Sequence, residues 1–327
     1  MSSCNFDSGS VKVLVTGASG FFGSHICRTF QRNPGQLYPG LEVVASVRTG
    51  SDRRRLERLA AGVSIVVFDL LADRSEIEAV FERFQPEIVV HCAAYGVDYR
   101  ERITELAIAT NVGATAKLIE IAAKHGVGRF LHIGTCSAYG GGDELIDETA
   151  PLAPRGIYAA TKAAGALIAL ERGAACGLPL LVIHPFSMYG PLEGIHKFVP
   201  MVMTHCLESR PLDLTSGEQK RDYIYVGDVA EACLMLATID DFPAGEVINV
   251  GSGISVSLRS FGDAAARMVG NGEQWLRWGR LPRRPDDIGL LVADTGKLHR
   301  LTGWRPSTHP NDGLRQTFEH LAQPPSP

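Results

Sequence analysis

The chain has 327 residues, and its 32 lysines and arginines against 36 aspartates and glutamates give a formal net charge of −4 at pH 7. That balance argues against a protein held to nucleic acid by its overall charge. Hydrophobic residues make up 45% and charged residues 21% of the chain. This is too apolar for a disordered protein, and no uninterrupted apolar run approaches the ~20 residues that a membrane-spanning helix needs.

The first half of the chain alternates apolar strand patterns with helical stretches. Strands are expected at 11–15, 42–47, 64–68, 87–90, 129–133 and 180–183, with helices at 23–31, 53–60, 76–84, 102–125 and 158–176 between them. This alternation indicates βαβ units, and nearly all-apolar strands indicate a parallel sheet covered on both faces. We therefore predict an α/β fold whose first domain, residues 1–184, is a doubly wound parallel sheet of the Rossmann type.

Residues 185–327 lose this rhythm. Four prolines, at positions 185, 191, 200 and 211, interrupt the stretch that follows the last strand, and the later elements are shorter. We predict a smaller α+β domain there that binds the substrate. The strand pattern 223–226 and the apolar helix 229–238 are expected to return to the main sheet, so that the first domain is rejoined at about 222–240.

The cysteines and histidines show no metal-binding or disulfide pattern. The seven cysteines are scattered without a C-x-x-C pair, and the histidines lack H-x-H and H-E-x-x-H spacing. We expect no metal site, and a location in a reducing cytoplasm. The polar residues 1–9 lack the features of a secretory signal.

A glycine-rich loop follows the first strand and opens the first helix. Residues 16–23 read T-G-A-S-G-F-F-G, so the glycines have the spacing G-x-x-G-x-x-G. The first glycine permits a tight turn, the second lets the backbone approach a pyrophosphate, and the third lets the helix pack on the strand. The helix N-terminus then offers free N–H groups to the phosphates. We predict that this loop binds a dinucleotide through Gly17, Ser19, Gly20, Phe21, Phe22 and Gly23.

The end of the second strand bears on which dinucleotide is bound. Enzymes that use NAD usually place an acid there, whereas an arginine suits the 2′-phosphate of NADP. No acid occupies positions 46–48, and Arg48 is followed by the run 53–55 of three arginines. Arg48 with one of these arginines and a serine hydroxyl would clamp a phosphate. The pattern favours NADP(H), with NAD(H) as the alternative if the arginines form a solvated helix face.

Tyr158 and Lys162 form a Y-x-x-x-K pair on an expected helix. Positions i and i+4 lie on one helix face, so the phenol and the ammonium can act on one ligand. A nearby positive charge favours the phenolate and lowers the tyrosine pKa toward the range of acid–base catalysis. Thr135 follows the fifth strand, at the sheet edge where open parallel sheets bind ligands, and its hydroxyl can donate to a substrate oxygen.

Together these segments resemble the extended short-chain dehydrogenase/reductases, in particular the nucleotide-sugar epimerase/dehydratase group. The resemblance covers nearly all of residues 11–306. It includes H-x-A-A at 91–94, Y-G at 139–140, a Y-G-P segment ending at 191, and R-D-x-x-Y-V at 221–226. Residues 111–115 read N-V-G-A-T, which is similar to the family's N-V-x-G-T segment. It implies further cofactor contacts by Asp69, Leu70, Ala93, Ala94, Asn111, Pro185 and Ser187, besides Tyr158 and Lys162. It implies substrate contacts by Tyr95, Ser137, Ser187, Val199, Arg221 and Arg284.

Two departures from the family pattern bear on the reaction. His184 and Ser187 replace the usual arginine and asparagine, which puts phosphate contacts there in doubt. Cys136 and Ser137 follow Thr135 where the 4,6-dehydratases carry Asp-Glu, the acids that protonate the leaving hydroxyl and abstract the C5 proton. Neither side chain readily does both jobs, which argues against 4,6-dehydration.

These observations favour an NAD(P)-dependent oxidoreductase that uses NADPH to reduce a nucleotide-linked 4-keto-6-deoxy sugar. Thr135, Tyr158 and Lys162 are the expected catalytic residues. A redox-neutral 4-epimerase with bound NAD, or a related dehydratase, is the alternative, and a non-enzymatic NADP-binding regulator is the third reading. The expected partner is a nucleotide-diphosphate sugar, with no nucleic acid and no membrane. Helices 102–125 and 158–176 are apolar on more than one face, and similar family members pair such helices, so we expect a homodimer.

Overall fold

The main sheet is parallel and has seven strands. The structure is a computed structural model that describes residues 10–33, 40–98, 100–101, 103–142, 144–283 and 288–323. The strands are β1 (Val11–Thr16), β2 (Leu41–Val47), β3 (Ser64–Val67), β4 (Ile88–His91), β5 (Arg129–Ile133), β6 (Leu180–Pro185) and β10 (Val247–Val250). Their order is β10-β6-β5-β4-β1-β2-β3, and every pairing is parallel. The predicted doubly wound α/β fold is confirmed.

Helices cover both faces of this sheet because side chains alternate along each strand. Val13 and Val15 of β1 pack into one apolar cluster, whereas Leu14 packs into another on the opposite face. The first face is covered by α1 (Phe21–Arg32), α8 (Val226–Thr238) and α10 (Gly296–Thr302). The second is covered by α3 (Arg74–Phe84), α5 (Thr115–Lys124) and α6 (Ile157–Cys176). The short helix α2 (Arg54–Leu59) packs beside α1.

The helix expected at 102–125 is interrupted in its middle. It consists of α4 (Thr104–Ile108), a π-helical turn over Ala109–Ala114, and α5. The stretch Thr104–Lys124 is the one helix among the described residues that is long and apolar enough to cross a membrane by length and composition, a weak criterion that core helices also meet. In this fold α5 packs between α3 and α6.

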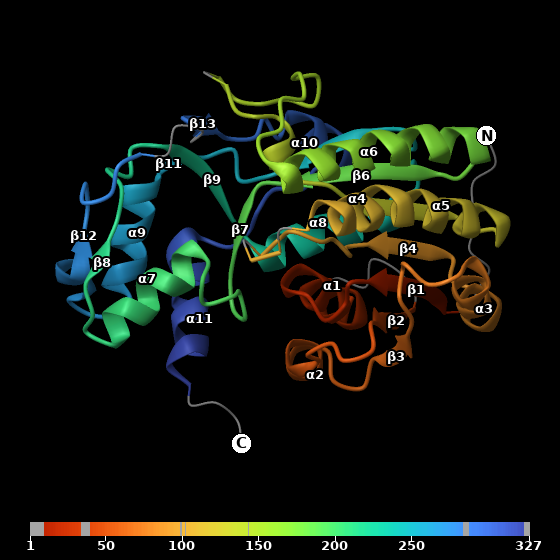
Figure 1. The fold of residues 1–327 in the computed structure, drawn as a ribbon, viewed down its shortest axis with the longest axis horizontal. Coiled ribbons are helices and arrows are strands. Elements are labelled where there is room, and N and C mark those ends of the chain that lie inside the picture. The colour runs from red at the N-terminus through yellow and green to blue at the C-terminus, as the bar shows by residue number, and fades with distance from the viewer. Residues whose placement is uncertain are drawn as a thin grey trace.

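A smaller domain lies beside the main sheet, at the left of Figure 1. Its sheet has the order β11 (Ser255–Ser257), β9 (Lys220–Tyr225), β13 (Leu290–Leu291), with β7 (Ser187–Tyr189) also paired to β9. β8 (Leu212–Asp213) pairs with β12 (Leu276–Arg277). Helices α7 (Phe198–Leu207), α9 (Leu258–Arg267) and α11 (Pro310–Ala322) complete it.

The strand expected at 223–226 does not join the main sheet, contrary to our prediction. It forms β9, which pairs within the smaller domain, while β10 and the helix α8 return to the main sheet. The reason is visible in its burial, which alternates along β9 as in a strand with one covered face, unlike the fully buried strands β4 and β5. The domain boundary at residue 184 stays a proposal; β6 itself runs to Pro185.

Strand order fixes where a ligand can bind. From β1 the chain proceeds to β2 on one side, and later to β4 on the other. The loops after β1 and β4 therefore diverge, and the crevice between them lies at the carboxyl edge of the sheet. Both the glycine loop and the segment after His91 are placed at this crevice.

Candidate active site

The glycine loop is shaped by contacts that exclude side chains. Gly17 has φ +67, and a Cβ there would lie 2.7 Å from the backbone of Ala93. A Cβ on Gly23 would lie 2.2 Å from the carbonyl oxygen of Gly17, so only glycine lets α1 start this close to β1. No side chain caps the N-terminus of α1, and its first turn holds no acid. The loop thus fits a dinucleotide, because an uncapped helix N-terminus favours a pyrophosphate.

The predicted cofactor residues differ in what their side chains can do. Phe22 packs in the core behind the loop, and Leu70 is also buried, so these two can offer only backbone groups. Ser19 and Phe21 are partly exposed at the loop. The exposed Asp69 closes a turn by accepting from the N–H of Leu71.

A buried histidine holds the two sides of the crevice together. Thr115 donates to the carbonyl of Asn111, so its oxygen accepts from Nε2 of His91 at 3.1 Å. The other ring nitrogen then accepts from the hydroxyl of Thr16 at 2.7 Å. Burial lowers the pKa of His91 to about 3, so the ring is neutral. His91 therefore ties β1 to α5 and has no free nitrogen for a ligand.

Asn111 positions the segment that follows β4. It lies in the π-helical turn, where its side chain accepts from the N–H of Tyr95, donates to the carbonyl of Tyr95, and donates to Thr161. Turns of this kind often occur at functional sites. The partly exposed Ala93 and Ala94 directly precede Tyr95 in the chain, and the backbone of Ala93 approaches Gly17 of the glycine loop. Asn111 is buried, so it acts on a ligand through this segment.

The arginines after β2 are not equivalent. Arg54 pairs with Asp52, and Arg55 donates to the carbonyl of Leu192 at 2.9 Å. The side chains of Arg48 and Arg53 have no hydrogen bond or ion pair to another residue that the structure describes. Arg48 is exposed and stands directly at the carboxyl end of β2. The end of β2 thus offers Arg48, with Arg53 in the following loop, and the acid of this loop, Asp52, is already paired with Arg54.

Thr135, Tyr158 and Lys162 come together at the carboxyl end of β5. Thr135 begins a short 3-10 helix, and its hydroxyl lies close enough to Tyr158 to act on the pKa of the phenol. Lys162, one turn along α6, is 3% exposed, and its ammonium donates to the carbonyl of Ile133 at 2.5 Å. The three side chains that the sequence singled out therefore surround the end of one strand.

Burial decides the protonation of this group. It raises the pKa of Tyr158 to about 12, although the side chain of Thr135 opposes this. Burial also lowers the pKa of Lys162 to about 8. The expected lowering of the tyrosine pKa by Lys162 is thus absent in the protein without ligand. At neutral pH the phenol is protonated and can donate a proton.

The two positions after Thr135 carry no acid. Cys136 is buried among Tyr139, Ile146 and Phe186, and burial raises its thiol pKa to about 12. The backbone N–H of Ser137 donates to Thr135. Cys136 is therefore a packed neutral side chain at neutral pH, and Ser137 offers only a hydroxyl.

Two further histidines lie beneath the site. His132 and His184 are fully buried, and none of their ring nitrogens has a hydrogen-bond partner among the described residues. Burial lowers the pKa of both rings, and Lys162 adds to this. A Cβ on Gly134 would lie 2.3 Å from the ring of His184. His184 therefore packs under β5 and cannot reach a phosphate in place of the family's arginine.

The predicted substrate residues are placed unevenly. Tyr95 and Ser187 are partly exposed near the crevice. Val199 is 2% exposed in the core of the smaller domain, so its side chain contacts no ligand. Arg221 donates to the carbonyls of Lys220 and Ile288, which braces β9 against the segment before β13. Arg284 lies outside the described residues. Pro185 ends β6.

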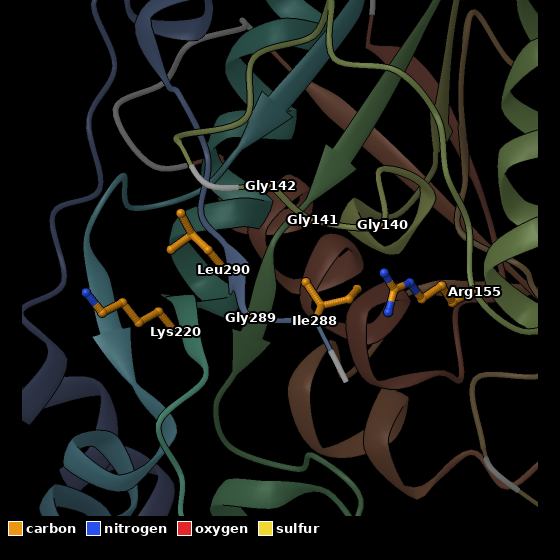
Figure 2. Close-up of a pocket in the computed structure, with 8 residues that line it drawn as sticks. All are labelled: Gly140, Gly141, Gly142, Arg155, Lys220, Ile288, Gly289 and Leu290. Carbon is orange, nitrogen blue, oxygen red and sulfur yellow. The ribbon is translucent and has the colours of Figure 1, made fainter. Parts of the chain in front are cut away.

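A cavity of about 450 Å³ opens between the loop after Tyr139 and the strands β9 and β13. Figure 2 shows its wall of three glycines, with Arg155 pointing toward Ile288 from one side and Lys220 on the other. Sequence reasoning missed Arg155 and Lys220. Both residues lie close in sequence to predicted site residues, which could have indicated them. Arg155 precedes Tyr158 by three residues, and Lys220 adjoins Arg221.

The protein has a glycine loop at the carboxyl end of β1 and a Thr–Tyr–Lys group at the carboxyl end of β5 of one doubly wound sheet. This combination defines a dinucleotide-dependent α/β enzyme. The chain belongs to the NAD dependent epimerase/dehydratase family, whose model matches residues 13–251. This membership confirms the resemblance to the extended short-chain dehydrogenase/reductases and the expectation of an NAD(P)-dependent enzyme.

The similar proteins include dehydratases and epimerases. A dTDP-glucose 4,6-dehydratase of Neisseria meningitidis is 30% identical, over 94% of this chain and 92% of its own. The structure of a Thermus thermophilus UDP-glucose 4-epimerase in complex with NAD is 30% identical, with a TM-score of 0.81, covering 95% of this chain and 99% of its own. That of the Streptomyces venezuelae dTDP-glucose 4,6-dehydratase with NAD is 27% identical, with a TM-score of 0.84, covering 94% and 96%.

Proposed function

We propose that the protein reduces the 4-keto group of a sugar linked to a nucleoside diphosphate, with NADPH as the reductant. The dinucleotide, when bound, supplies the hydride to C4. Tyr158 donates its proton to the C4 oxygen as charge develops there, and Thr135 holds that oxygen by a hydrogen bond. The products are the 4-hydroxy sugar and NADP⁺, with one proton taken from solvent to restore the phenol.

The observation that carries this proposal is the pair Cys136-Ser137 beside the Thr–Tyr–Lys group. Elimination of water across C5 and C6 needs a group that removes the C5 proton and a group that protonates the leaving hydroxyl. A buried thiol with a raised pKa stays protonated at neutral pH, so Cys136 cannot act as the base that removes the C5 proton. The nearby carboxylate of Asp222 accepts from Ser252, Gly253 and Ala293, which occupies it structurally. What remains is hydride and proton exchange at C4.

The protonated phenol supports the reductive direction. Ketone reduction needs an acid at the C4 oxygen, whereas alcohol oxidation needs a base. Tyr158 is in its acid form at neutral pH, as a phenol of ordinary pKa also is, and burial raises its pKa further. Arg48 and Arg53, which lack partners among the described side chains, support NADPH because they can pair with a 2′-phosphate. The relatives whose structures contain NAD favour the other dinucleotide.

The test is turnover of a nucleotide-linked 4-keto-6-deoxyhexose, generated in place by a 4,6-dehydratase, with NADPH absorbance as the readout. We expect consumption of one NADPH per sugar and a loss of kcat on Tyr158→Phe by roughly 10²–10⁴-fold. Release of water from the parent nucleotide sugar by this protein alone would instead show a dehydratase and refute the proposal.

A second candidate is a redox-neutral 4-epimerase that keeps NAD bound. The specific support is the similarity to UDP-glucose 4-epimerases, one of them 30% identical over nearly its whole chain. Epimerisation uses the same three side chains but needs no added reductant. Native mass spectrometry separates the candidates, because an epimerase retains NAD through purification and converts its substrate without added NADPH.

We also propose that two copies of the chain pair through α4 and α6. These helices contact each other, and Leu106, Ile108 and Leu167 are exposed on them, Leu167 by 56%. Leu118 and Ile121, further along the expected helix 102–125, lie in the core instead. A reducing cytoplasm stays a prediction; the described cysteines are free thiols.

A further inference from the structure

The loop between β7 and α7 is held firmly between the two domains. Three hydrogen bonds anchor it: from a ring nitrogen of His25 to the carbonyl of Pro191 (3.0 Å), from Arg55 to the carbonyl of Leu192 (2.9 Å), and from Lys197 to the carbonyl of Val97 (2.8 Å). Their partners lie on α1, on α2 and in the segment after β4. The loop therefore spans the crevice from the dinucleotide side to the segment of Tyr95.

These anchors impose an unusual backbone conformation. Leu192 has φ +67, a region that residues other than glycine rarely adopt because it strains the backbone. The backbone N–H of the next residue, Glu193, donates to the carbonyl of Gly190 at 3.3 Å. This turn sets the backbone position from which the Glu193 side chain starts.

One oxygen of the Glu193 carboxyl is buried without a partner in the described part of the chain, although the residue as a whole is only half-buried. Its Oε2 atom is shielded from solvent and has no hydrogen-bond partner among the residues that the structure describes. Burial raises the pKa of Glu193 to about 8, although Lys197 opposes this. A buried polar group without a partner is costly, so native structures rarely keep one without a reason.

The surroundings place this carboxyl between the reacting group and the smaller domain. The segment of Tyr95, which receives Lys197, lies on the reacting tyrosine: a Cβ on Gly96 would be 3.4 Å from the Cβ of Tyr158. On the other side, burial raises the pKa of Tyr223 on β9, and the Glu193 carboxyl adds to this, which places it near that strand. The loop that carries Glu193 is thus bonded to the segment that packs on Tyr158.

We propose that Glu193 is a substrate-binding residue whose carboxyl group bonds a hydroxyl group of the substrate's sugar ring. The inference rests on the proposed function, because it takes the ligand to be a nucleotide sugar. A protonated carboxyl both donates and accepts, which matches a sugar hydroxyl. The binding energy of the substrate then compensates for a carboxyl that the protein alone leaves without a partner.

The test compares a sugar nucleotide with the bare diphosphate. UDP, UDP-glucose, dTDP and dTDP-glucose are titrated by calorimetry into the full chain in the presence of NADPH. Glu193→Met keeps the side-chain volume and removes the hydrogen bond, whereas Glu193→Gln keeps an amide that donates and accepts. Glu218→Ala is the matched control, an exposed glutamate in the smaller domain. Melting temperatures confirm that each variant is folded.

We expect Glu193→Met to weaken binding of the glucose conjugate by roughly three- to tenfold and to leave the bare diphosphate unchanged. Glu193→Gln should restore most of the loss, and Glu218→Ala should match wild type. An equal effect on both ligands, or none, would overturn the inference while leaving the proposed function intact. If wild type bound neither sugar conjugate, the inference on Glu193 would be overturned, whereas the turnover assay with the 4-keto-6-deoxyhexose decides the proposed function separately.

Discussion

Replacing Lys162 by methionine should make the protein without its dinucleotide more stable while abolishing its activity. The ammonium is 3% exposed, and burial lowers its pKa from 10.5 to about 8. At pH 7 the amine is therefore charged in both the folded and the unfolded chain, and the folded protein bears the cost of burying that charge. Methionine has a similar length and carries no charge.

The pKa difference sets the size of the effect. The interval from 10.5 to about 8 corresponds to about 3.4 kcal/mol of unfolding free energy. Methionine also leaves the Ile133 carbonyl without its 2.5 Å partner, a loss of about 1–3 kcal/mol. We therefore expect Lys162→Met to raise the free energy of unfolding at pH 7 by about 1–2 kcal/mol.

The pH dependence gives the decisive sign. Because the folded pKa lies below the unfolded one, the unfolded chain binds more protons between about pH 8 and 10.5, and wild-type stability rises with pH through this interval relative to the variant. By about pH 10 the wild type should be the more stable of the two, since its neutral amine still donates a hydrogen bond to the Ile133 carbonyl. Urea unfolding at several pH values measures both curves. Parallel curves, with no change in their difference, would refute the reasoning.

Three further changes test other parts of the molecule. Arg48→Ala should weaken NADPH roughly ten- to hundredfold and spare NADH, because a charge-assisted contact is lost; equal, unchanged affinities measured by fluorescence titration would rule out a 2′-phosphate site. Gly23→Ala should abolish binding of either dinucleotide, since its Cβ would meet the Gly17 carbonyl at 2.2 Å, whereas Gly113→Ala, with open space around it, should bind normally; tolerance of the first change would contradict the tight loop. Leu167→Asp should halve the mass measured by light scattering, with the exposed Leu207→Asp as control, and a monomeric wild type would reject the proposed pairing.

Part of the candidate site could be predicted from the spacing of residues close together in the sequence. The glycines of residues 16–23 and the pair Tyr158–Lys162 act through geometry that the neighbouring backbone fixes, and both lie where the spacing placed them. The protonation states of Tyr158 and Lys162 could not be predicted from the sequence. Burial by segments far along the chain raises the tyrosine pKa and lowers the lysine pKa, against the simple expectation from a nearby charge.

By itself, the sequence determined the order of strands and helices, the dinucleotide loop and the family, because these depend on periodicity and on spacings of a few residues. The tertiary structure alone decided which sheet residues 220–225 join, that Val199 packs in a core, that Arg221 braces two backbone carbonyls, and that Glu193 keeps a buried oxygen without a partner. These outcomes depend on contacts between residues that are distant in the chain. Burial and partnership are properties of such contacts, and no local pattern encodes them.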